Sequence, residues 1–190
     1  ESEDSSTDVP WDLETDLGTP LHTAIVMDRP EAVQVLLDAR AHVGKRNWFN
    51  QTPLMLALNL MRDDFAAALM QADDVGRTLD VPDEEGDTAL HYAARGRAVL
   101  SVEQLLRRKE VDAAKKNGNN QTPLMLAVQV GCTGTVGMFL LRDSSWYAQV
   151  VQELNMVDYD EKSALAYAVE MNSVKLTCLL LEHGASRESA

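Results

Sequence analysis

The eight residues NQTPLMLA occur twice in this chain, at residues 50–57 and again at residues 120–127. In both copies a Thr-Pro pair stands directly before an apolar run. A threonine hydroxyl can accept a hydrogen bond from a free N–H group at a helix start, and proline at the first helical position already has a helical φ. The residues Leu-Met-Leu-Ala that follow favour helix formation. Each copy therefore predicts the beginning of a helix.

Three imperfect copies of this helix start occur elsewhere in the chain. They are GTPLHTA at residues 18–24, GDTALHYAA at residues 86–94 and KSALAYA at residues 162–168. The hydroxyl residue that marks each start recurs after 33, 36, 34 and 41 residues, as Thr19, Thr52, Thr88, Thr122 and Ser163. A period near 33 with the pattern T-P-L-H-x-A is typical of ankyrin repeats, each a β-turn followed by two antiparallel helices.

The chain resembles the ankyrin-repeat family, most specifically at Thr19-Pro20-Leu21-His22 and at LLLEHGA, residues 179–185. The resemblance implies an all-α solenoid of helix-turn-helix units with β-hairpin loops. Because one helix pair cannot bury its own apolar face, neighbouring pairs must stack. We expect the ankyrin domain to cover residues 18–190, after an acidic segment at residues 1–17 that is predicted to be flexible. The five repeats are expected near residues 18–46, 47–82, 83–116, 117–157 and 158–187.

Two departures from the family pattern carry structural expectations. Asn50 and Asn120 stand where the family usually places a turn glycine, and asparagine tolerates the left-handed backbone, so these turns should form. The fifth repeat has Glu161 at this position, and its turn is expected to be irregular. The longest spacing lies before this repeat, where residues 144–154 carry a serine N-cap and apolar residues at helical spacing. That segment predicts a short added helix.

The charge of the chain restricts its partners. Thirty acidic residues against 17 basic ones give a net charge of −13, and seven of the acids lie in residues 1–16. A field of this sign repels phosphate backbones, so direct nucleic-acid binding is disfavoured and a cationic partner is easier to accommodate. The alternative is that the negative charge only keeps the protein soluble and does not select a partner.

Targeting and redox signals point to the inside of the cell. No apolar stretch approaches the roughly 18 residues of a membrane span, and the acidic N-terminus is unlike a signal peptide. Two cysteines, Cys132 and Cys178, are too few for a disulfide framework. We therefore expect a reducing compartment, cytoplasmic or nuclear, and no membrane insertion. No feature of the sequence determines the oligomeric state.

No motif in the sequence indicates catalysis, a metal site or a cofactor. The chain lacks a G-x-S-x-G elbow, a phosphate-binding loop and a dinucleotide-binding fingerprint. His22 and His91 occupy the histidine position of the repeat, where the resemblance implies a structural hydrogen-bonding role. His42 and His183 have no cysteine or carboxylate at a metal-site spacing. We expect no enzyme activity.

The resemblance implies a binding surface, because in the ankyrin family the hairpin tips and first helices form a concave face that binds proteins. Trp48 and Phe49 are two adjacent aromatic residues at an expected exposed turn, a type of residue that often anchors interfaces. The acids from Asp83 to Asp87 would attract a basic partner. The candidate partner-binding residues are Arg46, Trp48, Phe49, Leu60, Asp83, Glu84, Glu85, Asp87, Arg95, Asn119, Gln129 and Tyr159.

Three functional hypotheses follow from the sequence. The first is a non-enzymatic adaptor or scaffold that binds a protein or peptide with a basic segment. The second is the regulatory ankyrin segment of a larger enzyme or membrane protein, packed against its own catalytic or channel domain. The third is a reader of methylated lysine, with an aromatic cage built from Trp48, Phe49 and neighbouring acids.

Overall fold

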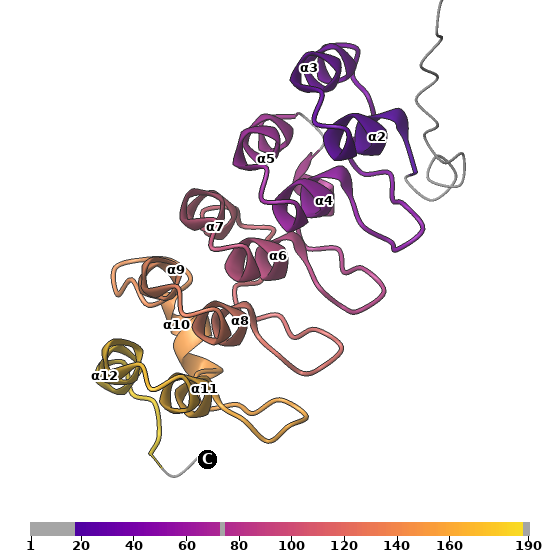
Figure 1. The fold of residues 1–190 in the computed structure, drawn as a ribbon. Helices are drawn as coiled ribbons and strands as arrows, with labels where there is room; N and C mark the ends of the chain where they lie inside the picture. The colour runs from indigo at the N-terminus through magenta and orange to yellow at the C-terminus, as the bar shows by residue number, and fades with distance from the viewer. Residues whose placement is uncertain (1–17, 73–74, 188–190) are drawn as a thin grey trace, which may run out of the picture.

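The computed structural model describes residues 18–72 and 75–187, in which helices pair and the pairs stack in one direction (Figure 1). The first helix of each pair lies in an inner row, formed by α2 (Pro20–Val26), α4 (Pro53–Asn59), α6 (Ala89–Arg95), α8 (Pro123–Gln129) and α11 (Ala164–Glu170). The second helices form an outer row, α3 (Pro30–Asp38), α5 (Asp63–Met70), α7 (Val99–Leu106), α9 (Thr133–Phe139) and α12 (Val174–Glu182). The expected all-α solenoid is confirmed. The acidic segment at residues 1–17 lies outside the described residues.

The connecting loops form hairpin turns that project from the inner row (Figure 1). They contain hairpin backbone hydrogen bonds, such as that from Asn47 N–H to the carbonyl of Gln51, 3.0 Å. Bridge pairing within the described ranges is confined to Val157 and Ser163. None of the helices in those ranges has the length and apolar character that crossing a membrane requires.

The helices begin where the repeated sequence predicts. The hydroxyls of Thr52 and Thr122 accept hydrogen bonds from the N–H groups of Met55 and Met125, each at 3.3 Å. Proline follows both threonines at the first helical position. Ser163 caps α11 in the same way, through the N–H of Ala166. These hydroxyls satisfy N–H groups that the helix itself leaves unpaired.

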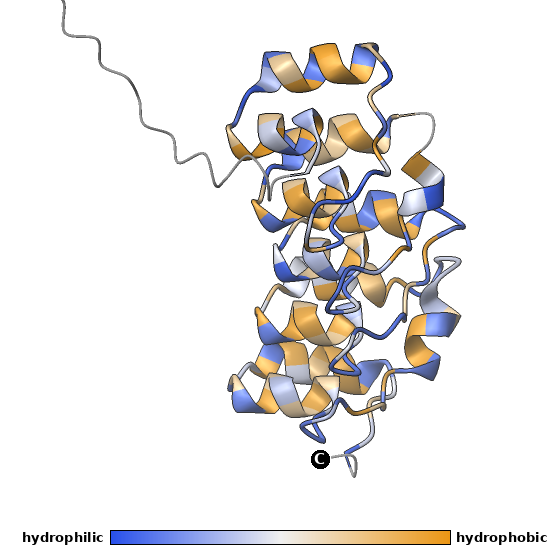
Figure 2. Ribbon diagram, turned by 90° about the vertical axis from the view of Figure 1, so that its right-hand side faces the viewer, coloured by the Kyte–Doolittle hydropathy of each residue, from blue (hydrophilic) through white to orange (hydrophobic). Residues whose placement is uncertain are grey.

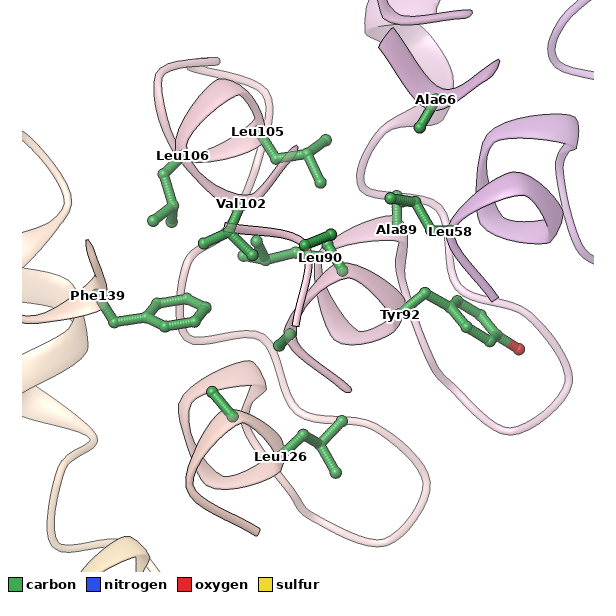
Figure 3. Packing of buried hydrophobic residues seen from close by; sticks show 14 of the residues in the cluster. Leu58, Ala66, Ala89, Leu90, Tyr92, Val102, Leu105, Leu106, Leu126 and Phe139 are labelled. Carbon is green, nitrogen blue, oxygen red and sulfur yellow. The ribbon is translucent and has the colours of Figure 1, made fainter. Parts of the chain in front are cut away.

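Stacking of successive pairs builds one continuous core. Inner helices pack on inner helices and outer helices on outer helices along the stack, and orange apolar residues recur in each pair (Figure 2). Figure 3 shows how one region of this core gathers side chains from three successive repeats. The buried residues there include Leu58, Leu90, Leu105, Leu126 and Phe139. Each pair therefore covers apolar surface that its neighbour cannot bury alone.

The hairpin turns use the left-handed backbone region at equivalent positions. Asn50 and Asn120 have φ values of 57° and 60°, and Gly86 has 82°. Glu161 also adopts a φ of 60°, so the expectation of an irregular fifth turn is wrong. Asp158 explains the difference, because its carboxylate accepts hydrogen bonds from the N–H groups of Asp160 and Lys162, both at 3.0 Å.

The predicted added helix is present as α10 (Tyr147–Gln152). Val150 and Leu154 bury their side chains against the stack, and the Trp146 indole donates to the carbonyl of Met138 at 3.0 Å. The expected serine cap is absent, because the Ser144 hydroxyl donates to the carbonyl of Leu141 instead. A 3-10 helix, η1 (Val75–Thr78), lies in the second repeat.

The short loops between inner and outer helices also contain left-handed residues. Asp28 and Asn172 have φ values of 53°, and their side chains tolerate this conformation. Gly131 takes it in the fourth repeat without steric cost. Met61 and Arg97 adopt it at 56° and 59°, where a longer side chain is disfavoured. The two loops therefore hold a locally costly backbone.

Replacing Leu105 with Ala should lower the free energy of unfolding by about 2–5 kcal/mol, because the cavity would lie in the middle of the shared core. Urea denaturation measures the loss. The matched control is Leu100→Ala on the same helix, where the leucine is exposed and the change should stay within about 0.5 kcal/mol. Equal losses for the two variants would contradict the burial pattern.

Replacing Met61 with Gly should raise the free energy of unfolding by about 0.5–1 kcal/mol. Glycine removes the steric cost of the left-handed backbone, and its greater unfolded-state entropy offsets only part of that gain. Thermal and urea denaturation measure the change. Met61→Ala truncates the same side chain but keeps the steric cost, so it should show no such gain, and a gain equal to that of glycine would refute the explanation.

Candidate functional site

Each hairpin tip in the described part of the chain is held by the side chain of one Asn or Asp. The Asn47 side-chain oxygen accepts hydrogen bonds from the N–H groups of Phe49, 3.0 Å, and Gln51, 2.9 Å. The same arrangement recurs at Asp83, Asn117 and Asp158. This local bonding fixes the turn backbone, so the residues at the tip are presented to solvent in a defined conformation.

The tips lie side by side along the stack and are bonded to one another. The guanidinium of Arg46 donates to the carbonyl of Pro82 at 3.3 Å, which joins the second and third tips. Gly118 N–H donates to the carbonyl of Glu85 at 2.7 Å. Tyr159 N–H donates to the carbonyl of Asn119 at 3.2 Å. The tips therefore form one row on the inner side of the solenoid (Figure 1).

Histidine joins the first repeat to the second. The N–H of Thr19 donates to Nδ1 of His22, so Nε2 carries the proton and donates to the carbonyl of Gln51 at 3.1 Å. His91 repeats this arrangement with Thr88 and the carbonyl of Gln121. Burial lowers the pKa of both histidines, which favours the neutral form. Both side chains have the structural role that the resemblance implied.

Tyrosine joins the second repeat to the third. The Gln51 amide donates to the Tyr92 hydroxyl at 2.7 Å, and that hydroxyl donates to the Asp83 carboxylate at 2.6 Å. Burial and the hydrogen bond to Asp83 raise the pKa of Tyr92. Gln121, Tyr167 and Asp158 form the same combination between the fourth and fifth repeats. The role of these tyrosines was not predicted, although the equal spacing of Asp83 from Tyr92 and of Asp158 from Tyr167 is visible in the sequence.

Asp87 does not have the position expected of a partner contact. Its side chain is buried, with one oxygen 2.6 Å from Nη2 of Arg95 and the other 2.7 Å from the Asn117 amide. The carboxylate of Asp83 is likewise occupied by Tyr92 and by backbone N–H groups. Asp87 is therefore not part of an exposed binding surface, and its prediction as a partner contact is wrong. The exposed acids of the third tip are Glu84 and Glu85.

The other candidate residues are arranged along the row of tips and the ends of the inner helices. Trp48 and Phe49 are 67% and 59% exposed on the second tip, and Tyr159 is 76% exposed on the fifth. Leu60 is 41% exposed beyond the end of α4, and Gln129 is half-buried at the end of α8. Arg46 and Asn119 are exposed on the second and fourth tips.

A pocket of about 280 Å³ connects some of these residues. Phe49, Glu84 and Glu85 line it from the tips, and Asn59 and Arg95 line it from the ends of α4 and α6. Gln51, Asp83 and Tyr92 complete the lining. Trp48, Asn119, Gln129 and Tyr159 do not line this pocket.

The charge of the pocket favours a cation. Its three carboxylates face one guanidinium, that of Arg95, whose charge is offset by Asp87. The guanidinium carbon lies 5.7 Å from the centroid of the Tyr92 ring, so the side chain is held against the pocket wall. A lysine or arginine side chain could pair with Glu84 or Glu85 without displacing Arg95.

The described ranges contain no cluster of three or more His, Cys, Asp or Glu residues that could hold a metal ion. Cys132 and Cys178 are not joined in a disulfide. The candidate residues present exposed aromatic rings and carboxylates on a hydrogen-bonded backbone.

Comparison with known proteins gives matches along most of the chain. A family model described as "Ankyrin repeats (3 copies)" matches residues 100–189, and one described as "Ankyrin repeat" matches residues 16–48. The crystal structure of the ankyrin repeat domain of Bcl-3 superposes with a TM-score of 0.71 at 30% identity. That superposition covers 88% of this chain and 72% of the solved one.

Curated relatives are similar in sequence and much longer. The B-cell lymphoma 3 protein homolog of Mus musculus is 32% identical over 182 residues, which are 92% of this chain and 38% of that protein. The neurogenic locus notch homolog protein 2 of Homo sapiens is 31% identical over 135 residues, 71% of this chain and 5% of that protein. The chain thus spans well under half the length of these relatives.

Lowering the pH should weaken the junctions made by His22 and His91. Their pKa values are lowered in the folded state, so the stabilisation is complete above about pH 6.5 and is lost as the pH falls below it. Urea denaturation between pH 7.5 and about pH 5 measures this loss. A His22→Gln, His91→Gln variant cannot bind those protons and should show a flatter pH dependence. An unchanged slope would show that other groups control it.

Proposed function

Because the chain belongs to the ankyrin-repeat family, we propose that it is a non-enzymatic protein-interaction module, an adaptor or scaffold. The proposed binding surface consists of the row of hairpin tips and the adjoining ends of the inner helices. Its proposed partner is a protein or peptide with a basic segment. The unpaired cysteines support a reducing, intracellular setting, cytoplasmic or nuclear.

The exposure of Trp48 and Phe49 carries the proposal. Two adjacent aromatic side chains remain 67% and 59% exposed, although aromatic rings gain considerable free energy from burial. The Asn47 side chain holds the backbone beneath them, so the rings start from a preorganised turn. Little backbone conformational entropy is then lost when a partner covers them.

The exposed acids support a basic partner. Glu84 and Glu85 lie on the tip next to the aromatic pair, and Asp160 and Glu161 lie on the fifth tip. Opposite charge across an interface mainly accelerates encounter and selects among partners. A basic segment would therefore be drawn to the row of tips before its apolar side chains reach Trp48 and Phe49.

The regulatory role in a larger protein remains a second proposal. It is supported by the relatives, of which this chain spans only 38% and 5%. In that case the segment covering the tips would belong to the same polypeptide. The methyl-lysine hypothesis loses support, because Phe49 and Tyr92 line the pocket but Trp48 does not.

Truncation of the aromatic pair tests the proposed site. Proteins captured by the wild-type chain and lost with the Trp48→Ala, Phe49→Ala variant would be purified and their affinities measured by surface plasmon resonance. The truncation should weaken binding by at least about 2 kcal/mol, as expected for interface anchors. A Glu84→Lys, Glu85→Lys variant should instead slow association and flatten its dependence on salt.

The matched control is Leu141→Ala, which truncates an exposed apolar side chain just beyond α9, away from the tips. It should leave the affinity unchanged. A partner whose binding ignores both tip variants would show that the chain binds through another surface.

A further inference from the structure

Two loops between inner and outer helices expose an apolar edge formed by Met27, Leu60 and Met61. Their exposed fractions are 39%, 41% and 70%. The loops are neighbours, since Oδ2 of Asp28 lies 3.0 Å from Nη1 of Arg62. The apolar edge therefore spans the first two repeats at the ends of α2 and α4.

The fold accounts for the backbone of Met61 but not for its side chain. Its φ of 56° recurs at the equivalent loop position of the other repeats, where Asp28, Arg97, Gly131 and Asn172 stand, but its apolar side chain is largely exposed. The position thus combines a disfavoured backbone with an apolar surface that the fold leaves in water. Methionine is common at binding surfaces because it adapts its shape.

The apolar edge lies at the C-terminal ends of α2 and α4, whereas Glu84 and Glu85 lie on the third tip, before the N-terminal end of α6. The helix α4 begins beside its hairpin tip and ends at Asn59, directly before Leu60. Its seven residues span roughly 10 Å, at 1.5 Å per residue. An α-helix with its side chains is about 10–12 Å wide. A partner helix that packs on the inner row is therefore wide enough to contact the hairpin tips and the apolar edge at the same time.

The pocket of about 280 Å³ connects the hairpin tips with the C-terminal end of α4, next to the apolar edge. Phe49, Glu84 and Asn59 line the same pocket, and Asn59 adjoins Leu60. Arg95 also faces the pocket, but its ion pair with Asp87 offsets its charge.

We infer that the partner segment is an amphipathic, basic α-helix, and this inference rests on the proposed function. Its apolar side chains cover Met27, Leu60 and Met61, and its basic side chains face Glu84 and Glu85. Neighbouring helices pack about 8–10 Å apart, so crossing the first three repeats requires roughly 20 Å. A helix of about 13 residues or more has this length.

Synthetic peptides of about 18 residues provide the test. One peptide places leucines on one helical face and lysines along its edge, and a second has the same composition with both residue types distributed around the helix. Binding to the wild-type chain is measured by fluorescence anisotropy. The segregated peptide should bind more tightly, and a Leu60→Ser, Met61→Gly variant should weaken it by about tenfold or more.

Stability separates this effect from unfolding. Glycine at residue 61 removes the steric cost of the left-handed backbone. The same variant should therefore bind less tightly, and the change at residue 61 should not lower its melting temperature. Leu141→Ser, at an exposed leucine away from the edge, is the matched control and should leave the affinity unchanged.

The outcomes distinguish the two proposals. If the edge variant binds the segregated peptide as tightly as the wild type while Glu84→Lys, Glu85→Lys weakens it, the tips bind and the amphipathic helix is refuted. Equal binding of the two peptides, or no binding of either, also overturns the inference. If neither the tip variants nor the edge variant affects a bound peptide, the proposed surface itself fails.

Discussion

The structure depends on the fact that a single helix pair cannot bury its own apolar face. Each pair in this chain is covered by its neighbours, and buried leucines such as Leu58, Leu90 and Leu126 come from three successive inner helices. Apolar contact is not directional, so it does not by itself fix how one pair sits on the next. Directional hydrogen bonds between the repeats supply that second constraint.

Two sets of these hydrogen bonds, one made by histidine and one by tyrosine, alternate along the stack. A histidine of the preceding repeat, His22 or His91, donates to the carbonyl of Gln51 or Gln121. The amide of the same glutamine then donates toward Tyr92 or Tyr167 of the following repeat. Each glutamine therefore bonds in both directions, and both lie inside the repeated octapeptide. The two copies of the octapeptide, two repeats apart, thus place a glutamine with the same two contacts at equivalent junctions.

Much of this fold could be predicted from the sequence because its signals are local. The threonine caps, the prolines and the apolar spacing all act within a few residues of one another, and they placed the helices correctly. The environment of Asp87 could not be predicted in this way. Its amide partner, Asn117, lies 30 residues away, and a buried carboxylate looks the same in a sequence as the exposed ones beside it. Glu161 was misjudged for a related reason, because Asp158 stabilises a turn that glutamate alone disfavours.

The alternation of junctions also bears on how such a chain can change length. Loss of a single internal repeat would bring a surface that pairs through histidine against one that pairs through tyrosine, leaving buried donors and acceptors without their partners. Loss of the 70 residues that separate Gln51 from Gln121 would instead join two matching surfaces. The unit that can be removed or inserted without breaking this bonding is a pair of repeats, so the chain behaves as an array with a period of two.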